Sequence, residues 1–319
     1  MTDQFVRHYL WAGLDFMIDR DGVPVLLDAN RSSHMMTEYL EFFGDDRPFA
    51  LTAARMNGAD GPPCLLWRRG EPLADGGEDA PFIGRHLAAH LAAEPIVCDV
   101  EDNQEPRAEL VGRDGRSVTP GSIFRWWYGL PWSYERAGVL VVNPNCAWAI
   151  VRDKASYPDH FAGSRHFRVA TSFPVETRQQ AVDLIEARPD LFSHGFVLKP
   201  RVGWGGYGVQ VGDAGDRPMP WSGDYVLCER VVPSLREGRF WDVRVFVMDG
   251  EYLGGIQYNS AKPVTNFHQG GTPSRLDQGL AARLREPALE AVRRIDELAD
   301  VVHRLPEPPE TPLVHVVYQ

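Results

Sequence analysis

Long apolar runs, paired cysteines and lysine are all scarce in this sequence of 319 residues. No apolar run approaches the roughly 20 residues that span a membrane, so we expect no membrane association. The chain does not open on a basic region followed by an apolar stretch, so no signal peptide is expected. The four cysteines are widely spaced and form no CxxC pair, which leaves zinc and disulfide frameworks without support. A reducing cytoplasm is the expected compartment.

Acidic residues outnumber basic ones by 44 to 33, and the resulting net charge of −11 argues against nucleic acid as the main partner. Only three of the 33 basic residues are lysines, namely Lys154, Lys199 and Lys262. In so arginine-rich a chain, a retained lysine indicates a position that needs a compact point charge rather than a planar guanidinium. All three lysines lie near the phosphate-binding signals described below, so we treat them as candidate site residues.

The order of expected elements predicts an α/β (α+β) protein with more than one packed unit. A strand–helix–strand pattern over residues 62–140 predicts a small α/β domain, and the Gly- and Pro-containing stretch 45–61 has the composition of a linker. Strands are expected through much of 139–260, and a long amphipathic helix is expected over 286–305.

The stretch "GLDFMIDRDGVPVLLDAN" at residues 13–30 predicts a β-hairpin with a DRDG turn. Symmetric closure about the centre of this turn places Asp15 opposite Leu26. Cross-strand partners share a face, as do residues two apart along a strand, so Asp15, Asp28 and Asn30 are expected on one side. Hard oxygen donors grouped on one face suit Mg²⁺.

A glycine-rich segment, "FVLKPRVGWGGYGVQVG", predicts a strand, a flexible loop and a second strand. Its glycines free the backbone to turn amide N–H groups toward phosphate oxygens, and Lys199 ends the first strand. A dinucleotide fingerprint would open a helix here, and no GK[ST] follows as in a P-loop. A nucleotide-covering flap and a plain Gly-rich hairpin both remain open on these residues alone. The loop glycines are Gly203, Gly205, Gly206 and Gly208.

Five segments in continuous order resemble the ATP-grasp superfamily, in particular its carboxylate–amine ligases such as the ribosomal-protein glutamate ligases and D-alanine–D-alanine ligase. They span about residues 139–272 and read "VLVVNPNCAWAIVRDKAS", "FVLKPRVGWGGYGV", "YVLCERVVP", "FWDVRVFVMDG" and "PVTNFHQGG". The resemblance implies bound ATP and Mg²⁺. It assigns ATP contacts to Lys154, Lys199, the four loop glycines, Glu229, Val231 and Val232, and it assigns catalytic roles to Arg244 and Asn266. The stretch "QYNSAKPVTN" lacks the arginine that the glutamate ligases carry, and Lys262 is expected to supply that charge as a third catalytic residue.

In that family the metal site is a hairpin carrying an aspartate followed on the next strand by Glu-x-Asn, and here Asp28 stands in the glutamate position. Relatives carry this hairpin near the C-terminus, so its place at the start predicts a circularly permuted ATP-grasp fold. The expected units are a permuted C-terminal piece at 1–44, a linker at 45–61, a preceding domain at 62–140, a central lid subdomain at 141–224 and a C-terminal subdomain at 225–319.

The resemblance implies an ATP-dependent ligase that joins a small-molecule carboxylate to an amine through an acyl phosphate, releasing ADP and phosphate. Two alternatives stay open from the sequence. One is an ATP-grasp phosphotransferase acting on a hydroxyl, and the other is a nucleotide-binding protein without turnover. The partners are then an amino-acid or peptide carboxylate and amine, and the oligomeric state is open, with a homodimer among the options.

Overall fold

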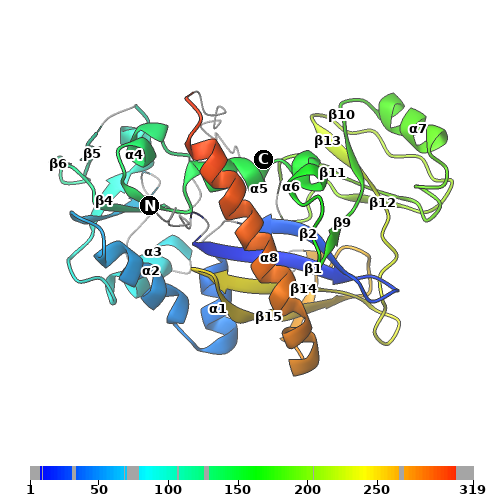
Figure 1. Ribbon diagram of the computed structural model, residues 1–319, viewed down its shortest axis with the longest axis horizontal. Helices are drawn as coiled ribbons and strands as arrows, with labels where there is room; N and C mark the ends of the chain where they lie inside the picture. Colours follow the sequence, from blue (N-terminus) through cyan, green and yellow to red (C-terminus); the bar gives the residue numbers. More distant parts are fainter. Residues whose placement is uncertain are drawn as a thin grey trace.

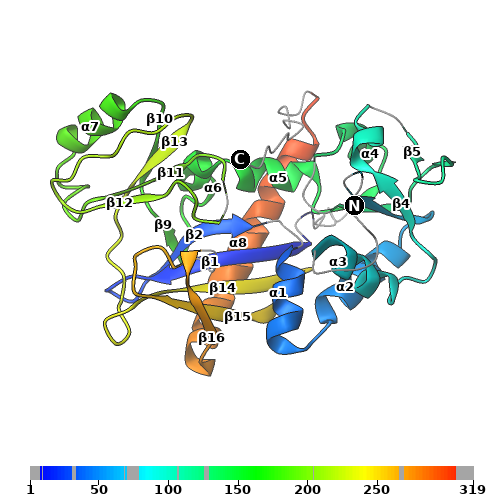
Figure 2. The same cartoon turned by 180° about the vertical axis from the view of Figure 1, so that it is seen from behind.

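The computed structural model describes residues 8, 10–30, 34–67, 69, 79–105, 108–125, 129–203, 205–265 and 269–306. Its largest sheet has six strands in the order β16-β15-β14-β1-β2-β9 and lies in the middle of the molecule (Figures 1 and 2). All neighbours are antiparallel except the parallel pair β2 and β9. The strands are β1 (Trp11–Ile18), β2 (Pro24–Asn30), β9 (Arg168–Val169), β14 (Phe240–Met248), β15 (Glu251–Ser260) and β16 (Thr272–Arg275).

The predicted N-terminal hairpin is present as β1 and β2, but its register differs from the expected one. The turn is held by Asp19, whose N–H donates to the Val23 carbonyl (3.0 Å) and whose carboxylate accepts from the Val23 N–H (2.7 Å). A β-bulge after Asp15 then shifts the pairing, so that Asp15 lies opposite Asp28 and not opposite Leu26. The two carboxylates are therefore direct cross-strand partners.

Helices cover both faces of the six-stranded sheet. The 26-residue helix α8 (Gln278–His303) crosses the face seen in Figure 1, and α1 (His34–Phe43) lies on the face seen in Figure 2. Because strand side chains alternate, β14 supplies both cores: Val243 and Val245 pack in the cluster with α8, whereas Phe246 packs with Tyr39 of α1. The hairpin is thus buried on both sides, which fixes the position of its polar residues.

A second, parallel sheet has the order β4-β3-β7-β8. The expected linker at 45–61 is wrong in part, because residues 47–57 form a helix whose Phe49, Ala53 and Met56 are buried at helical spacing. The elements of this region are α2 (Arg47–Asn57), β3 (Pro63–Trp67), α3 (Asp79–Ala88), β4 (Ile96–Asp99), η1 (Val100–Asn103), β5 (Leu110–Val111), β6 (Ser117–Val118), β7 (Ser122–Arg125), α4 (Trp132–Arg136) and β8 (Leu140–Val142).

The third sheet, in the order β10-β13-β11-β12, lies beside the six-stranded sheet with α7 on its outer side (Figure 1). As predicted, the glycine-rich segment connects two paired strands, β11 and β12. The elements are α5 (Asn145–Arg152), η2 (Lys154–Ser156), α6 (Tyr157–His160), β10 (Ser172–Val175), α7 (Arg178–Ala187), β11 (Phe196–Pro200), β12 (Gln210–Gly212) and β13 (Tyr225–Glu229). None of the helices in the described ranges combines the length and apolar character needed to cross a membrane.

Candidate active site

A cavity of about 260 Å³ lies between the six-stranded sheet and the sheet that contains β11 and β13. It brings together side chains and loop glycines that lie more than two hundred residues apart in the sequence. The predicted site residues in its lining are Asp15, Asp28, Asn30, Lys154, Lys199, Gly203, Gly205, Gly206, Glu229, Val231 and Arg244.

Asp15 is held by the neighbouring strand β14. The guanidinium of Arg244 donates to both oxygens of Asp15, at 2.8 and 3.0 Å, and Asn30 Nδ2 donates to Oδ2 at 3.1 Å. Arg244 also pairs with Glu38 of α1 at 3.1 Å. Burial works against the charged arginine, but Asp15 and Glu38 outweigh it and hold the pKa of Arg244 well above its usual value. Glu38 was not predicted, because only the packing of α1 on the sheet brings it here.

Asp28 faces a different cation. Its Oδ1 lies 3.2 Å from Lys154 Nζ and 3.0 Å from the hydroxyl of Tyr157. The side chains of Lys154 and Asp28 are 11% and 20% exposed, so the pair is largely shielded from solvent yet still reaches the cavity. Tyr157 was also missed, since nothing in its local sequence distinguishes it from a core tyrosine.

Lys154 contacts the glycine loop, whereas the second lysine, Lys199, contacts strand β2. Lys154 Nζ donates to the Gly203 carbonyl at 2.9 Å, and Lys199 Nζ donates to the Leu27 carbonyl of β2 at 3.2 Å. Gly205 and Gly206 are consecutive residues with φ of 66° and 71°, a left-handed conformation that other residues rarely adopt. The loop therefore depends on glycine for its curvature, as the sequence indicated. Gly208 belongs to the same loop but does not line the cavity.

The end of β13 forms the opposite wall. Glu229 Oε1 accepts from the Thr171 N–H at 2.8 Å and lies 3.5 Å from Arg168, which keeps the carboxylate at the cavity edge. Val231 lines the cavity, whereas the Val232 carbonyl accepts from the Arg20 N–H at 3.0 Å and ties β13 to the hairpin turn. Of the two valines, only Val231 is brought to the cavity.

Lys262 is predicted for the site but is not brought into the cavity. Lys262 is exposed, does not line the cavity, and its backbone N–H donates to Ser260 Oγ at 3.0 Å. Asn266 lies outside the described residues.

Asp242 is a cavity residue that the sequence analysis passed over. It lies two residues before Arg244 on β14 and accepts a hydrogen bond from Thr265. Burial raises the pKa of Asp242 to about 7, and the nearby charge of Asp15 adds to the effect. The D-x-R spacing could have revealed it, because residues two apart on a strand face the same side.

Asp242→Asn is expected to change how stability depends on pH. In the unfolded chain the carboxyl titrates near 3.9, so between about pH 4 and pH 7 the folded protein holds the extra proton and loses stability as pH rises. The asparagine variant lacks this loss, which is on the order of 4 kcal/mol across the window. Urea denaturation at pH 5 and pH 8 in metal-free buffer covers about two of these three pH units, so the expected difference there is about 3 kcal/mol. Equal pH dependence in both proteins would contradict the assignment.

The donor chemistry of the hairpin fits Mg²⁺, since Asp15, Asp28 and Asn30 offer carboxylate and amide oxygens from one face of adjacent strands. Facing them are two ammonium groups, one guanidinium and a glycine loop. The positively charged side chains and the backbone N–H groups of the loop can bind phosphate oxygens, and the two carboxylates can bind the accompanying metal ion. The cavity therefore suits a polyphosphate chain.

No protein-family model matches this sequence, and no curated protein matches it. Among solved structures, it resembles "Putative gamma-glutamylcysteine synthetase" from Methylobacillus flagellatus KT at 12% identity and a TM-score of 0.54, covering 93% of this chain and 89% of that one. D-cycloserine synthetase DcsG gives 16% identity and a TM-score of 0.42, covering 74% and 82% of the respective chains.

D-alanyl-alanine synthetase A from Vibrio cholerae gives 12% identity and a TM-score of 0.48, covering 75% of this chain and 82% of that one. At these identities a likeness establishes the fold and no more. This chain therefore shares the mixed α/β fold of the Methylobacillus flagellatus structure over nearly its whole length.

Proposed function

We propose that this protein is an ATP-dependent carboxylate–amine ligase of the ATP-grasp type. The observation that carries the proposal is the single cavity in which Asp15 and Asp28 meet Lys154, Lys199 and the glycine loop. The sequence resemblance assigns these residues to ATP and metal binding from separate segments, and the fold brings them to one place. The fold shared with the Methylobacillus flagellatus structure, which is described as a putative gamma-glutamylcysteine synthetase, also supports a ligase.

In this proposal the ATP phosphates lie between the glycine loop and the two lysines, and the adenine lies toward Val231 and Glu229 at the end of β13. Asp15, Asp28 and Asn30 hold Mg²⁺, which supplies charge neutralisation at the phosphates. The base of the loop is fixed for this task, because Arg201 pairs with Asp153 through two hydrogen bonds of 2.8 and 2.6 Å. The Lys154 N–H also donates to the Arg201 carbonyl at 3.2 Å.

The chemistry that this arrangement supports is transfer of the γ-phosphoryl group to a substrate carboxylate, followed by attack of an amine and release of phosphate. No protein nucleophile is needed, so the protein contributes positioning and positive charge. Lys154 and Lys199 offset charge on the phosphates, and Arg244 faces the transferred group once substrates are bound. The glycine loop excludes water and so protects the activated carboxylate from hydrolysis.

The proposal includes the permuted chain order. In the fold, β1 and β2 occupy the middle of the six-stranded sheet next to β14, although they come first in the sequence. A metal hairpin moved from the end of the chain to its start accounts for this placement, with residues 1–44 as the transferred piece. Rearrangements of this kind are tolerated where chain ends lie at the surface.

The deciding experiment follows ADP release from Mg·ATP with pooled amino acids and small carboxylic acids, including glutamate and cysteine, in the presence of hydroxylamine. We expect hydroxamate to form together with ADP, because hydroxylamine intercepts an acyl phosphate. Asp28→Asn removes a metal-binding charge at nearly constant shape, and we expect it to lower the rate by at least about 100-fold.

Arg113→Gln serves as a matched control, since its partner Asp99 lies in the parallel sheet and neither residue lines the cavity. ADP with a phosphorylated product and no hydroxamate would identify a phosphotransferase. AMP with pyrophosphate would mean adenylation and overturn the proposed mechanism. Unchanged ADP release in Asp28→Asn would remove the hairpin from the site.

A further inference from the structure

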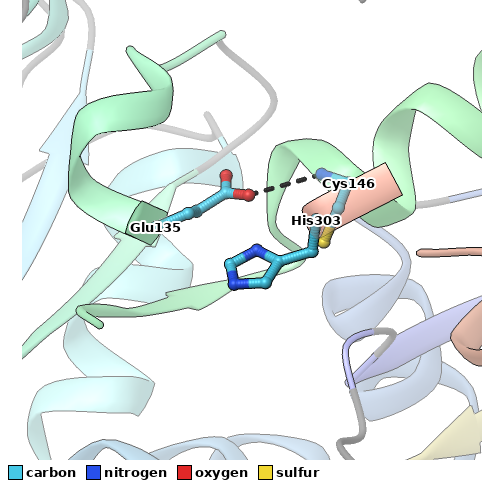
Figure 3. Close-up of side chains that lie close together, drawn as sticks. All are labelled: Glu135, Cys146 and His303. Carbon is cyan, nitrogen blue, oxygen red and sulfur yellow. Dashed lines mark hydrogen bonds between the residues drawn. The ribbon is translucent and has the colours of Figure 1, made fainter. Parts of the chain in front are cut away.

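A second group of metal-binding side chains lies outside the cavity, where α4, α5 and α8 meet (Figure 3). Glu135 comes from α4, Cys146 from the first turn of α5, and His303 is the last residue of α8. One donor atom from each lies within 4.8 Å of the others. Glu135 and Cys146 are 6% and 0% exposed, so the group is sheltered from solvent.

A fourth donor comes from the segment before β1. His8 Nδ1 lies 3.5 Å from the Cys146 sulfur, and its other ring nitrogen lies 3.6 Å from Asp300 of α8. The rings of His8 and His303 are 5.5 Å apart. The Nε2 atom of His8 is buried without a hydrogen-bond partner among the described residues, and a small closure toward Asp300 would give the carboxylate–imidazole pair that orients metal-bound histidines.

We propose that Glu135, Cys146, His303 and His8 form a structural Zn²⁺ site. Thiolate, imidazole and carboxylate are the donors that zinc takes in tetrahedral sites, at about 2.0–2.3 Å, which corresponds to donor separations of about 3.3–3.8 Å. The sulfur and His8 Nδ1 are already at such a separation. Glu135 and His303, whose donor atoms lie within 4.8 Å of each other and of the sulfur, need to close by about 1 Å, which side-chain rotation supplies. His8 is near the sulfur but outside this 4.8 Å group, so its ring has to swing further toward Glu135 and His303 to complete the site.

Part of the surroundings favours a cation at this position, although the buried guanidinium of Arg125 already acts on Glu135 and Cys146 with positive charge. The C-terminal end of α8 carries partial negative charge, and His303 extends from it. Glu135 also accepts hydrogen bonds from the backbone N–H groups of Asn145 and Cys146, as Figure 3 shows for Cys146. These bonds orient the carboxylate and leave each oxygen a further lone pair for a metal. Zinc here would join His8, the neighbouring helices α4 and α5, and the end of α8, which come from three distant parts of the sequence.

The test uses the full chain, freed of metal and kept in excess Mg²⁺ so that the oxygen donors of the hairpin are occupied. Co²⁺ is titrated as the probe. We expect a thiolate-to-cobalt absorption band that saturates near one equivalent and disappears when Zn²⁺ displaces Co²⁺. Cys146→Ser should abolish the band, and His303→Gln should weaken Co²⁺ binding by at least about tenfold.

Cys64→Ser is the matched control, because it removes another fully buried thiol, in β3, and should leave the band intact. The proposal is overturned if the unchanged protein shows no band, or if the band survives in Cys146→Ser. Should Cys146→Ser fail to fold, His303→Gln decides, since unchanged Co²⁺ affinity there also overturns the site. Co²⁺ binding is measured without ATP, so a negative result would overturn the zinc site and leave the ligase proposal unaffected. A negative result in the hydroxylamine assay would likewise leave the zinc site unaffected.

Discussion

Lys199→Met is expected to lower the rate of ADP release at saturating Mg·ATP by at least about 100-fold. Methionine keeps the length and apolar stem of lysine, so β11 and its pairing with β13 should be preserved. The ammonium that lies at the cavity wall, 3.2 Å from the Leu27 carbonyl, is lost. In the proposed mechanism that charge stabilises the phosphates most strongly while the phosphoryl group is being transferred. A coupled assay of ADP release, with the carboxylate and amine identified by the hydroxamate screen, measures the effect.

The control for this variant is Arg217→Met, which removes a positive charge from the same region of the chain. Arg217 pairs with Glu186 at the surface, its side chain is 66% exposed, and it does not line the cavity. We expect the control to keep its rate within about twofold, because exposed ion pairs contribute little. Equal rates in Lys199→Met and Arg217→Met would contradict a role for Lys199 in phosphate binding.

Arg244→Met is expected to destabilise the metal-free protein by about 3 kcal/mol. Arg244 is 14% exposed and neutralises two carboxylates, Asp15 and Glu38, which are 16% and 20% exposed. Removing the guanidinium leaves two shielded negative charges facing one another. Urea denaturation in buffer with a chelator measures the loss. Arg293→Met is the control, because its pair with Glu297 is exposed and should contribute less than about 1 kcal/mol.

The same variant also tests the metal site. If Asp15 binds Mg²⁺, adding Mg²⁺ should stabilise Arg244→Met more than it stabilises the unchanged protein, because the ion replaces the missing positive charge. We also expect Arg244→Met to lose ADP release. Added Mg²⁺ should not restore it, since Mg²⁺ cannot take over the contact of Arg244 with the transferred group. Equal stabilisation by Mg²⁺ in the two proteins would argue that Asp15 is a structural partner of Arg244 and not a metal ligand.

The central strands and their polar faces were predictable because their signals are local. Alternation along β1 and β2 placed Asp15, Asp28 and Asn30 on one side, and the glycine loop was identified by composition alone. The register was not predictable, because the turn that closes through Asp19 moves the pairing by one residue, placing Phe16 opposite Leu26, and the bulge after Asp15 moves it by one more. The shift had little effect on the site, since both registers leave the two carboxylates on the same face.

The remaining differences arise from tertiary contacts. Helix α2 was not predicted, because the Gly- and Pro-containing residues after it have the composition of a linker. The helix is stabilised by burial of its apolar face in the core. Helix α8 begins at Gln278, before the expected residue 286, because Asp277 caps it and Pro287 is accommodated inside it. Tyr157 reaches the cavity, and Glu38 reaches Arg244, only because α6 and α1 pack beside the hairpin, and no local pattern distinguishes them.

The position of the hairpin also has a consequence for how the protein is made. β1 leaves the ribosome first, but its sheet partner β14 starts at residue 240, and Asp15 pairs with an arginine 229 positions later. The hairpin therefore waits through the synthesis of more than 200 residues without the strand that covers one of its edges. Sheets that depend on such distant pairings fold slowly and expose strand edges while they wait. Truncated nascent chains ending before β14 should accordingly be protease-sensitive in this hairpin, and chains that include α8 should be protected.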